Sequence, residues 1–248
     1  MKKILYVNGC SHCCGAEISY VGSHRTPEDL ELSWPGQLSK KYNVIHKNDA
    51  LSGQGNQSIY SNTVHSILDL LKRYRPEEIF VIIGWSGFER TDYIYEDKRY
   101  MFIPGTEIGS KSFDHWPSEV KQAFKYWILG CDFNNDLMNQ TALLYFSMRI
   151  FLEKYNVDYY FINTVHPYFM PTKNLLHKLD NHSVNMHILN LLKQDTNYLE
   201  PFNNDMAYYQ YMKARHNGHI EGRNHHFLEH AQREWAELID KKIGYKFL

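Results

Sequence analysis

The chain has 248 residues, with 27 Lys and Arg against 28 Asp and Glu, 43% hydrophobic residues and a net charge of −1. This length can bury a sizeable core without metal or disulfide support, and the near-neutral charge excludes a polycationic surface that binds nucleic acid. No apolar run approaches the roughly 18 residues of a membrane span. The four cysteines form no disulfide framework, because three of them cluster at positions 10, 13 and 14. The first apolar stretch, Ile4 to Val7, is too short for a signal-peptide core, so we expect a soluble cytoplasmic protein.

Short β-branched runs alternate with longer helical patterns along the chain, which indicates an α/β fold. We expect strands over residues 4–7, 43–46, 79–83 and 157–162, with a weaker fifth over 198–202. Apolar residues at helical spacing predict amphipathic helices over 60–74, 144–155 and 227–239. Because the strands are apolar on both faces, we predict a three-layer α/β/α, flavodoxin-like parallel sheet of about five strands.

One segment breaks the alternation of strands and helices. Residues from about 92 to 139 are rich in Tyr, Trp and Gly, and contain one helical pattern from Val120 to Ile128. We therefore expect a single domain over residues 1–248, with an inserted helical segment at about 92–139 that acts as a lid.

In parallel α/β sheets, ligands bind beyond the carboxyl ends of the strands. The first such turn contains Ser11, whose hydroxyl would lie at the mouth of the sheet, with its N–H directed to the same place. That arrangement suits a nucleophile whose oxyanion the N–H stabilises. The position alone favours the simpler interpretation that Ser11 caps the next helix.

Three later turns supply further candidate residues. Gly53, after the second strand, permits a positive φ and a close approach of its N–H to a ligand, although the spacing is not that of a phosphate-binding loop. Trp85, Ser86 and Arg90 follow the third strand and would face the same place. His219, before the last helix, can act as a general base near neutral pH, but a lone loop histidine is more often solvated or structural.

This ordered set resembles the SGNH (GDSL-type) hydrolase superfamily. Gly9-Cys10-Ser11 is similar to its first block, which holds the nucleophile, and Ser52-Gly53-Gln54 to its second, whose glycine donates an oxyanion N–H. Ile83 to Ser86 lies where the third block is expected, and His219 where the fifth is. The nearest resemblance is to uncharacterised bacteriophage members, through Gly15-Ala16-Glu17, Ser33-Trp34-Pro35, Gly53 to Asn56, and Ile83 to Ser86 with Arg90.

The resemblance implies a serine esterase. His219 would take the proton of Ser11, the N–H groups of Ser11 and Gly53 would hold the oxyanion, and the substrate-binding residues would be Asn56, Trp85, Ser86 and Arg90. The implied substrate is a small-molecule or carbohydrate ester, with an O-acetylated sugar as the first candidate. We expect no cofactor, no metal, no nucleic-acid partner and no membrane, and a phage-encoded chain would act in the host cytoplasm.

Two departures from the family pattern weaken the implied site. The asparagine of the third block, an oxyanion donor, is replaced by Ser86. The family has an acid three residues before the histidine, where this chain has His216, or two residues before it, where this chain has Asn217. Neither side chain carries a negative charge. Asp205 and Glu221 are candidates for a substitute carboxylate. In serine proteases, loss of the acid lowers kcat by about 10⁴-fold, and loss of one oxyanion donor lowers it by about 10²–10³-fold.

Three other functions are compatible with the sequence. The first is a zinc hydrolase or a protein with a structural metal. Two pairs have spacings that metal ligands use: Cys10 with Cys13, and His226 with His230, which lie one helical turn apart. The missing acid and asparagine are compatible with a catalytically weak or inactive protein of this fold that binds a small nucleotide or sugar. A structural or assembly protein that uses the fold as a scaffold is the third.

Overall fold

The computed structural model describes residues 1–20, 22–23, 25–104, 111–131, 136–166, 186–216 and 226–247. The strands in these ranges are β1 (Ile4–Gly9), β2 (Ile45–Asn48), β3 (Ile79–Trp85), β4 (Thr91–Tyr95), β5 (Lys98–Phe102) and β6 (Asp158–Asn163). The α-helices are α1 (Ser11–Cys14), α2 (Pro27–Leu32), α3 (Trp34–Tyr42), α4 (Asn56–Leu70), α5 (Lys111–Asp114), α6 (Ser118–Gly130), α7 (Asp136–Lys154), α9 (Met186–Gln194), α10 (Tyr208–Arg215) and α11 (Glu229–Ile243). Short 3-10 helices are η1 (Pro76–Glu78), η2 (Asn204–Met206) and η3 (Gly244–Phe247).

The main sheet has four strands in the order β2-β1-β3-β6, and all its pairs are parallel. The two central strands, β1 and β3, are buried along their whole lengths, because helices cover both faces. The predicted strand at 43–46 begins later, at Ile45, since Asn43 ends α3 in a left-handed conformation with φ 50°.

The predicted fifth strand is reduced to one isolated parallel bridge between Tyr198 and Phe161. Pro201 lacks the N–H that a continuing ladder needs. Its carbonyl instead accepts a hydrogen bond from Nδ2 of Asn163, at 3.0 Å.

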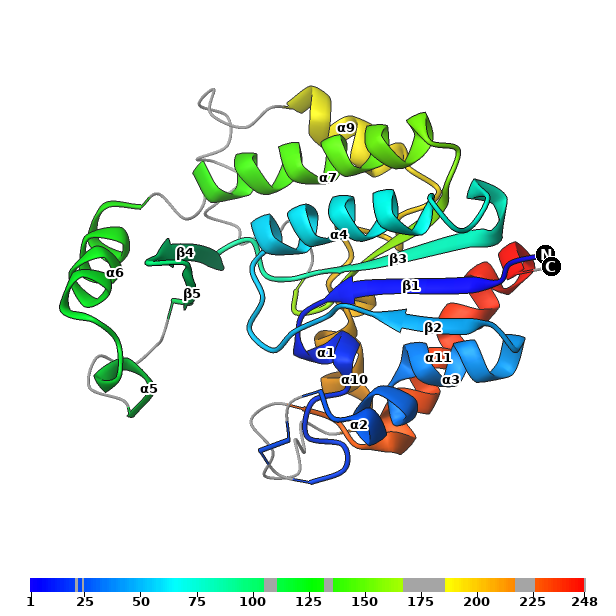
Figure 1. Ribbon diagram of the computed structural model, residues 1–248, viewed down its shortest axis with the longest axis horizontal. Coiled ribbons are helices and arrows are strands. Elements are labelled where there is room, and N and C mark those ends of the chain that lie inside the picture. Colours follow the sequence, from blue (N-terminus) through cyan, green and yellow to red (C-terminus); the bar gives the residue numbers. More distant parts are fainter. Residues whose placement is uncertain are drawn as a thin grey trace.

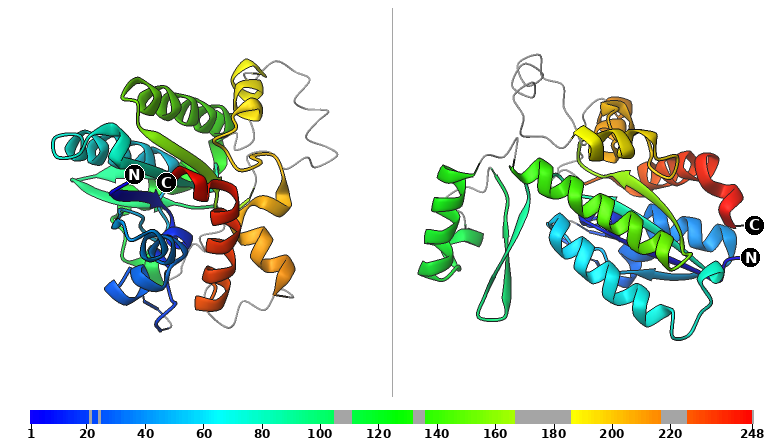
Figure 2. Two further views of the ribbon diagram at one scale, coloured as in Figure 1. Left: turned by 90° about the vertical axis from the view of Figure 1, so that its right-hand side faces the viewer. Right: turned by 90° about the horizontal axis from the view of Figure 1, so that it is seen from above.

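Helices cover the sheet in two layers (Figures 1 and 2). On one face, α4, α7 and α9 bury a core with β3 and β6 that includes Ile67, Met148 and Phe161. On the other face, α3, α10 and α11 bury a second core that includes Leu38 and Trp235. The predicted three-layer α/β/α fold is confirmed.

Residues 91–104 and 111–130 form an arm beside the carboxyl ends of the strands (Figure 1). The arm consists of the β4–β5 hairpin and helices α5 and α6, and Figure 2 shows it projecting from the body. It has a small core of its own, built from Phe102, Phe113, Val120 and Phe124. The predicted helical pattern from Val120 to Ile128 lies within α6, and the β4–β5 hairpin was not predicted. None of the helices described above is both long and apolar enough to cross a membrane.

Candidate active site

The candidate site lies where the chain reverses its direction through the sheet. From β1 the chain passes through α1 to α3 on one face to reach β2, and from β2 through α4 on the other face to reach β3. The carboxyl ends of β1 and β3 are therefore neighbours at a topological switch point, where open α/β sheets bind ligands. Ser11 follows β1 at this point and Ser86 follows β3.

Ser11 is the first residue of α1 and is 7% exposed. The residue in the N-cap position is Cys10, so the interpretation of Ser11 as a helix cap is wrong. Among the residues that the structure describes, none forms a hydrogen bond with Ser11 Oγ. The hydroxyl is thus not used by the local structure, which leaves it available to a base and a substrate.

Three buried cysteines pack around this turn. Sγ of Cys10 lies 3.0 Å from Oγ1 of Thr164, and Sγ of Cys13 lies so close to Gly9 and Gly84 that a Cβ on either glycine would collide with it. Burial raises the pKa of Cys13 well above its usual value and that of Cys14 to about 12. The thiols of Cys13 and Cys14 therefore act as packing groups and are poor nucleophiles.

Gly53 lies in the loop that joins β2 to α4. Its φ is +73°, and a Cβ there would lie 2.5 Å from Sδ of Met101 in β5. The N–H of Leu51 donates to the carbonyl of Gly9 at 3.2 Å, which holds this loop against the end of β1. Both the backbone conformation and the contact with the arm require glycine here, close to the turn that carries Ser11.

Asn56 and Ser86 are joined to one another. Oδ1 of Asn56 accepts a hydrogen bond from the N–H of Ser86 at 2.9 Å, and its Nδ2 donates to the Ser86 carbonyl at 3.2 Å. Both residues are buried, and Oγ of Ser86 has no hydrogen-bond partner within the described chain. The amide of Asn56 therefore braces the turn after β3 against the start of α4, and its contact with substrate stays a prediction.

The structure does not bring Trp85 to the edge of the sheet. Its indole is fully buried under α7, with ring centroids 4.3 Å from Tyr145 and 5.6 Å from Phe161, so it packs in the core. Arg90 is half-buried on the turn after β3, where its N–H donates to the Gly87 carbonyl at 3.2 Å. Their proposed contacts with substrate are not tested by this arrangement.

Asp92 is a site residue that the sequence analysis missed. Its carboxylate accepts hydrogen bonds from the N–H groups of Gly55, at 3.4 Å, and Ser58, at 3.2 Å, at the start of α4. It thereby caps this helix from β4 and fixes the arm to the Gly53 loop. No sequence signal marks it, because the capping carboxylate comes from a different segment.

The predicted base, His219, lies outside the described residues, as do Asn217 and Glu221. His216 is described: it follows α10, and its Nε2 lies 3.2 Å from Oε2 of Glu234. Asp205 is exposed in η2, where its N–H donates to Asn203. The described residues thus place no carboxylate at the positions that the family pattern would use.

A second missed feature is a buried carboxylate–imidazole pair. Glu17 is fully buried, and its Oε2 lies 2.9 Å from Nδ1 of His226. The ring of His226 in turn lies 5.4 Å, between centroids, from the ring of His12, the residue after Ser11. Glu17 belongs to the Gly15-Ala16-Glu17 motif, but its partner is 209 residues away, beyond the reach of any local spacing rule.

The two histidines of one predicted metal pair have different neighbours. His226 pairs with Glu17, whereas the ring of His230 lies 5.1 Å from that of His216. Across the described residues, no group of three or more His, Cys, Asp or Glu side chains comes together in a way that could hold a metal ion.

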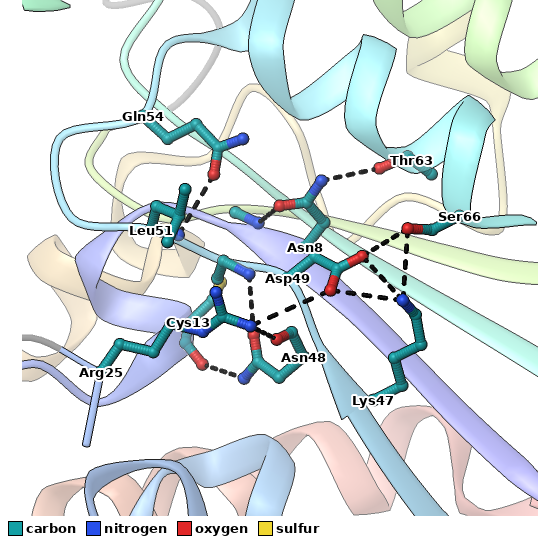
Figure 3. Close-up of polar contacts among 12 residues, drawn as sticks. Asn8, Cys13, Arg25, Lys47, Asn48, Asp49, Leu51, Gln54, Thr63 and Ser66 are labelled. Carbon is teal, nitrogen blue, oxygen red and sulfur yellow. Dashed lines mark hydrogen bonds and ion pairs between the residues drawn. The ribbon is translucent and has the colours of Figure 1, made fainter. Parts of the chain in front are cut away.

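A polar cleft of about 570 Å³ borders the Gly53 loop along α4. Its lining residues are Arg25, Asp49, Leu51, Ser61, Asn62, His65 and Ser66. Figure 3 shows Asp49 held in place by Lys47, at 3.3 Å, and by Oγ of Ser66, at 2.5 Å, with Arg25 at 3.9 Å. The wall is therefore rich in fixed hydrogen-bonding groups.

Comparisons with known proteins concern the fold. No protein-family model and no curated protein matches the sequence. Among solved structures, TesA is 11% identical with a TM-score of 0.52, over 98% of this chain and 99% of that one. A family two carbohydrate esterase from Clostridium thermocellum, in complex with cellohexaose, is 13% identical with a TM-score of 0.50; all of this chain matches 66% of that one.

The fold of this chain is similar to that of a carbohydrate esterase. A protein from Desulfitobacterium hafniense DCB-2 assigned to the lipolytic G-D-S-L family is 13% identical with a TM-score of 0.47, over 97% of this chain and 99% of that one. At 11% to 13% identity the likeness concerns the fold, so the chemistry has to be argued from the residues of this chain.

Proposed function

We propose that the chain is a serine hydrolase of ester bonds, with Ser11 as the nucleophile. The observation that carries the proposal is the place of Ser11: it follows β1 at the switch point, and no residue of the described chain bonds its hydroxyl. A hydroxyl kept unbonded at this point is suited to attack a carbonyl carbon once a base takes its proton. The esterase-like fold supports the same reaction class.

The oxyanion would be held by backbone groups. The N–H groups of Ser11 and Gly53 are the proposed donors, on adjacent turns that the Leu51–Gly9 hydrogen bond holds together. Preorganised N–H groups of this kind are typical of oxyanion holes, and each contributes about 10²–10³ in rate. An imidazole would take the proton of Ser11, and the family resemblance assigns that part to His219.

The proposed substrate is a carbohydrate ester, with an O-acetylated sugar as the first choice. The cleft beside the Gly53 loop supports this choice, because hydroxyl, amide, imidazole and charged side chains line most of it. Such a wall offers hydrogen bonds to sugar hydroxyls. The esterase with a similar fold was determined with cellohexaose.

A second candidate function is the capture of a small sugar or nucleotide without turnover. It is favoured by the third strand, where Ser86 stands in place of the family asparagine and the amide of Asn56 is already bonded to backbone. This arrangement removes one side-chain oxyanion donor from the site.

Covalent labelling with a fluorophosphonate probe separates the two functions. We expect the natural chain to be labelled and to hydrolyse p-nitrophenyl acetate, and Ser11→Ala to lose both. Ser118→Ala is the matched control: Ser118 is exposed on α6, its hydroxyl donates a hydrogen bond to Glu119, and its removal should leave labelling unchanged. A folded natural chain without label or turnover that binds a sugar by calorimetry would favour the second function.

A further inference from the structure

The fold has taken the carboxyl group of Glu17 out of water. The residue is fully buried and adopts φ +65°, and its Oε1 accepts a hydrogen bond from the N–H of Gly22 at 3.0 Å. The other oxygen, Oε2, faces Nδ1 of His226 at 2.9 Å. Burying a carboxylate is costly unless it is paired and hydrogen-bonded, so a strained backbone and a distant histidine are both used to keep this one in place.

His226 lies beside the nucleophile turn. Its ring borders that of His12, which follows Ser11 directly, and its side chain keeps 12% of its surface exposed. The pair therefore has the polarity of a catalytic base and its orienting acid: the carboxylate is inside, and the imidazole reaches the surface. The contact with Oε2 of Glu17 uses Nδ1 of His226, so Nε2 is the ring nitrogen that faces away from the carboxylate.

The surrounding contacts fix α1 against the start of α11. The indole of Trp34 donates to the His12 carbonyl at 3.1 Å, and the N–H of Trp34 donates to Oε1 of Gln232 at 3.2 Å. The segment that carries Ser11 and the segment that follows His226 are thus both held by Trp34. Such rigid support is what a site needs to keep base and nucleophile in register.

Two other histidine–carboxylate pairs allow a comparison. His166 pairs with Glu89 at 2.8 Å, and His216 with Glu234 at 3.2 Å. Their carboxylates are 23% and 33% exposed, so water screens both. Glu17 alone among these three carboxylates is fully shielded, and shielding strengthens its interaction with an imidazolium.

We propose that Glu17 and His226 are the acid and the general base of the Ser11 site, in the chain order Ser11, Glu17, His226, so that the carboxylate missing from the His219 loop is supplied by the segment after α1. This inference rests on the proposed hydrolase function and assigns to His226 the part that the family resemblance gives to His219.

The proton balance is that of acyl transfer. As Ser11 Oγ bonds to the ester carbonyl carbon, its proton passes to Nε2 of His226, and the carbonyl electron pair moves to the oxygen. The imidazolium, held through Nδ1–H by ionised Glu17, then gives this proton to the leaving alkoxide. In the second half, a water oxygen bonds to the acyl carbon as the water loses a proton to Nε2; the bond from that carbon to Ser11 Oγ then breaks, and the proton on Nε2 passes to Oγ, which frees the carboxylic acid.

The test measures kcat/KM for p-nitrophenyl acetate and the rate of fluorophosphonate labelling in five proteins: the natural chain and the variants His226→Ala, Glu17→Gln, His219→Ala and His166→Ala. We expect His226→Ala to lower kcat/KM by about 10²–10⁴-fold, the contribution of a general base, and Glu17→Gln by a similar factor. His219→Ala and the matched control His166→Ala should change it less than about tenfold. Circular dichroism checks that each variant is folded.

Imidazole added to the buffer gives a second readout that a structural role would not move. It should restore part of the rate of His226→Ala, through the space that the side chain leaves, and have no effect on Glu17→Gln. Loss of activity confined to His219→Ala or His166→Ala, or a His226→Ala variant that is fully active, would overturn the inference while the hydrolase function stands. A natural chain that neither turns over ester nor is labelled at Ser11 would overturn both.

Discussion

The two sides of the Ser11 turn are stabilised by different forces. The α1 side (residues 10–20 and 25–29 with His226) buries two carboxylates, Glu17 and Asp29, and holds each with directed hydrogen bonds. The α4 side (residues 49–58 and 84–102) depends on backbone shape and packing, at Gly53 and Trp85. Substitutions of the two buried carboxylates should therefore depend on pH, whereas substitutions of Gly53 and Trp85 should not.

The largest expected effect is on the α4 side. Trp85→Ala removes a fully buried indole packed against Tyr145 and Phe161, and should lower the free energy of unfolding by about 3–5 kcal/mol. Urea unfolding should give the same loss at pH 5 and pH 8. Trp85→Phe is the control: Nε1 of Trp85 has no partner within the described chain, so it should cost less than about 1.5 kcal/mol. A Phe variant that is stable but inactive would instead place the indole against substrate.

Next is Asp29 on the α1 side. Its carboxylate accepts hydrogen bonds from Ser19 N and Oγ, Ser23 Oγ, and Thr26 N and Oγ1. Burial alone would raise the pKa of Asp29, but these hydrogen bonds outweigh it and hold the pKa below 3.8. Asp29→Ala should therefore cost about 2–3 kcal/mol of unfolding free energy at pH 7.

The cost of Asp29→Ala should depend on pH in a definite direction. Because the pKa is lower in the folded than in the unfolded chain, the stabilisation is complete above about pH 4 and is lost as the pH falls through the folded-state value. Urea midpoints of the natural chain and the variant should converge below pH 4. A difference that stays constant from pH 7 to pH 3 would show that the charge of Asp29 contributes nothing.

Gly53→Ala tests the backbone of the α4 side. The substitution forces an L side chain into φ +73° and against Met101, which should cost about 2 kcal/mol and lower ester turnover by displacing the N–H. Met101→Ala in the same chain removes the collision and leaves the strain, so it should recover about half of the stability. Full recovery in the double variant would show that the positive φ is not required.

The smallest expected effect is at Asp92. Asp92→Asn keeps an acceptor for Gly55 and Ser58 but loses the charge at the start of α4, and should cost about 0.5–1 kcal/mol. For a chain of this size that is a fall in Tm of about 1–4 °C. Asp97→Asn is the matched control, because Asp97 is exposed at the turn of the same hairpin with φ 58°. Equal falls in Tm for the two variants would contradict the capping role of Asp92.

Hydrophobic pattern was enough to predict the body of the fold. The β1, β3 and β6 strands are apolar on both faces and give a signal that nothing else in the chain imitates. The β4–β5 hairpin was not predicted, since its strands Thr91–Tyr95 and Lys98–Phe102 are mostly half-exposed. Its turn is Glu96-Asp97, both at positive φ without a glycine, so the usual hairpin signal is missing.

The candidate site could be predicted only for residues whose place is set by the strand directly before them. Ser11 and Gly53 lie on turns that directly follow strands, so their neighbourhood could be inferred from position. Glu17 and His226 meet through folding across 209 residues, and a search for an acid three residues before a histidine could not find them. Trp85 was assigned to the ligand because it ends a strand, but a side chain at that position can point to either face, and here it points into the core.

The thiol of Cys13, pressed against Gly9 and Gly84 and kept protonated by burial, makes the centre of the sheet observable from solution. A thiol reagent can reach the sulfur of Cys13 only when β1 and β3 separate at their carboxyl ends. The rate at which Cys13 is modified therefore measures how often this edge of the sheet opens. Half-buried Cys131, at the end of α6, offers a second sulfur by which motion of the arm can be timed separately from motion of the body.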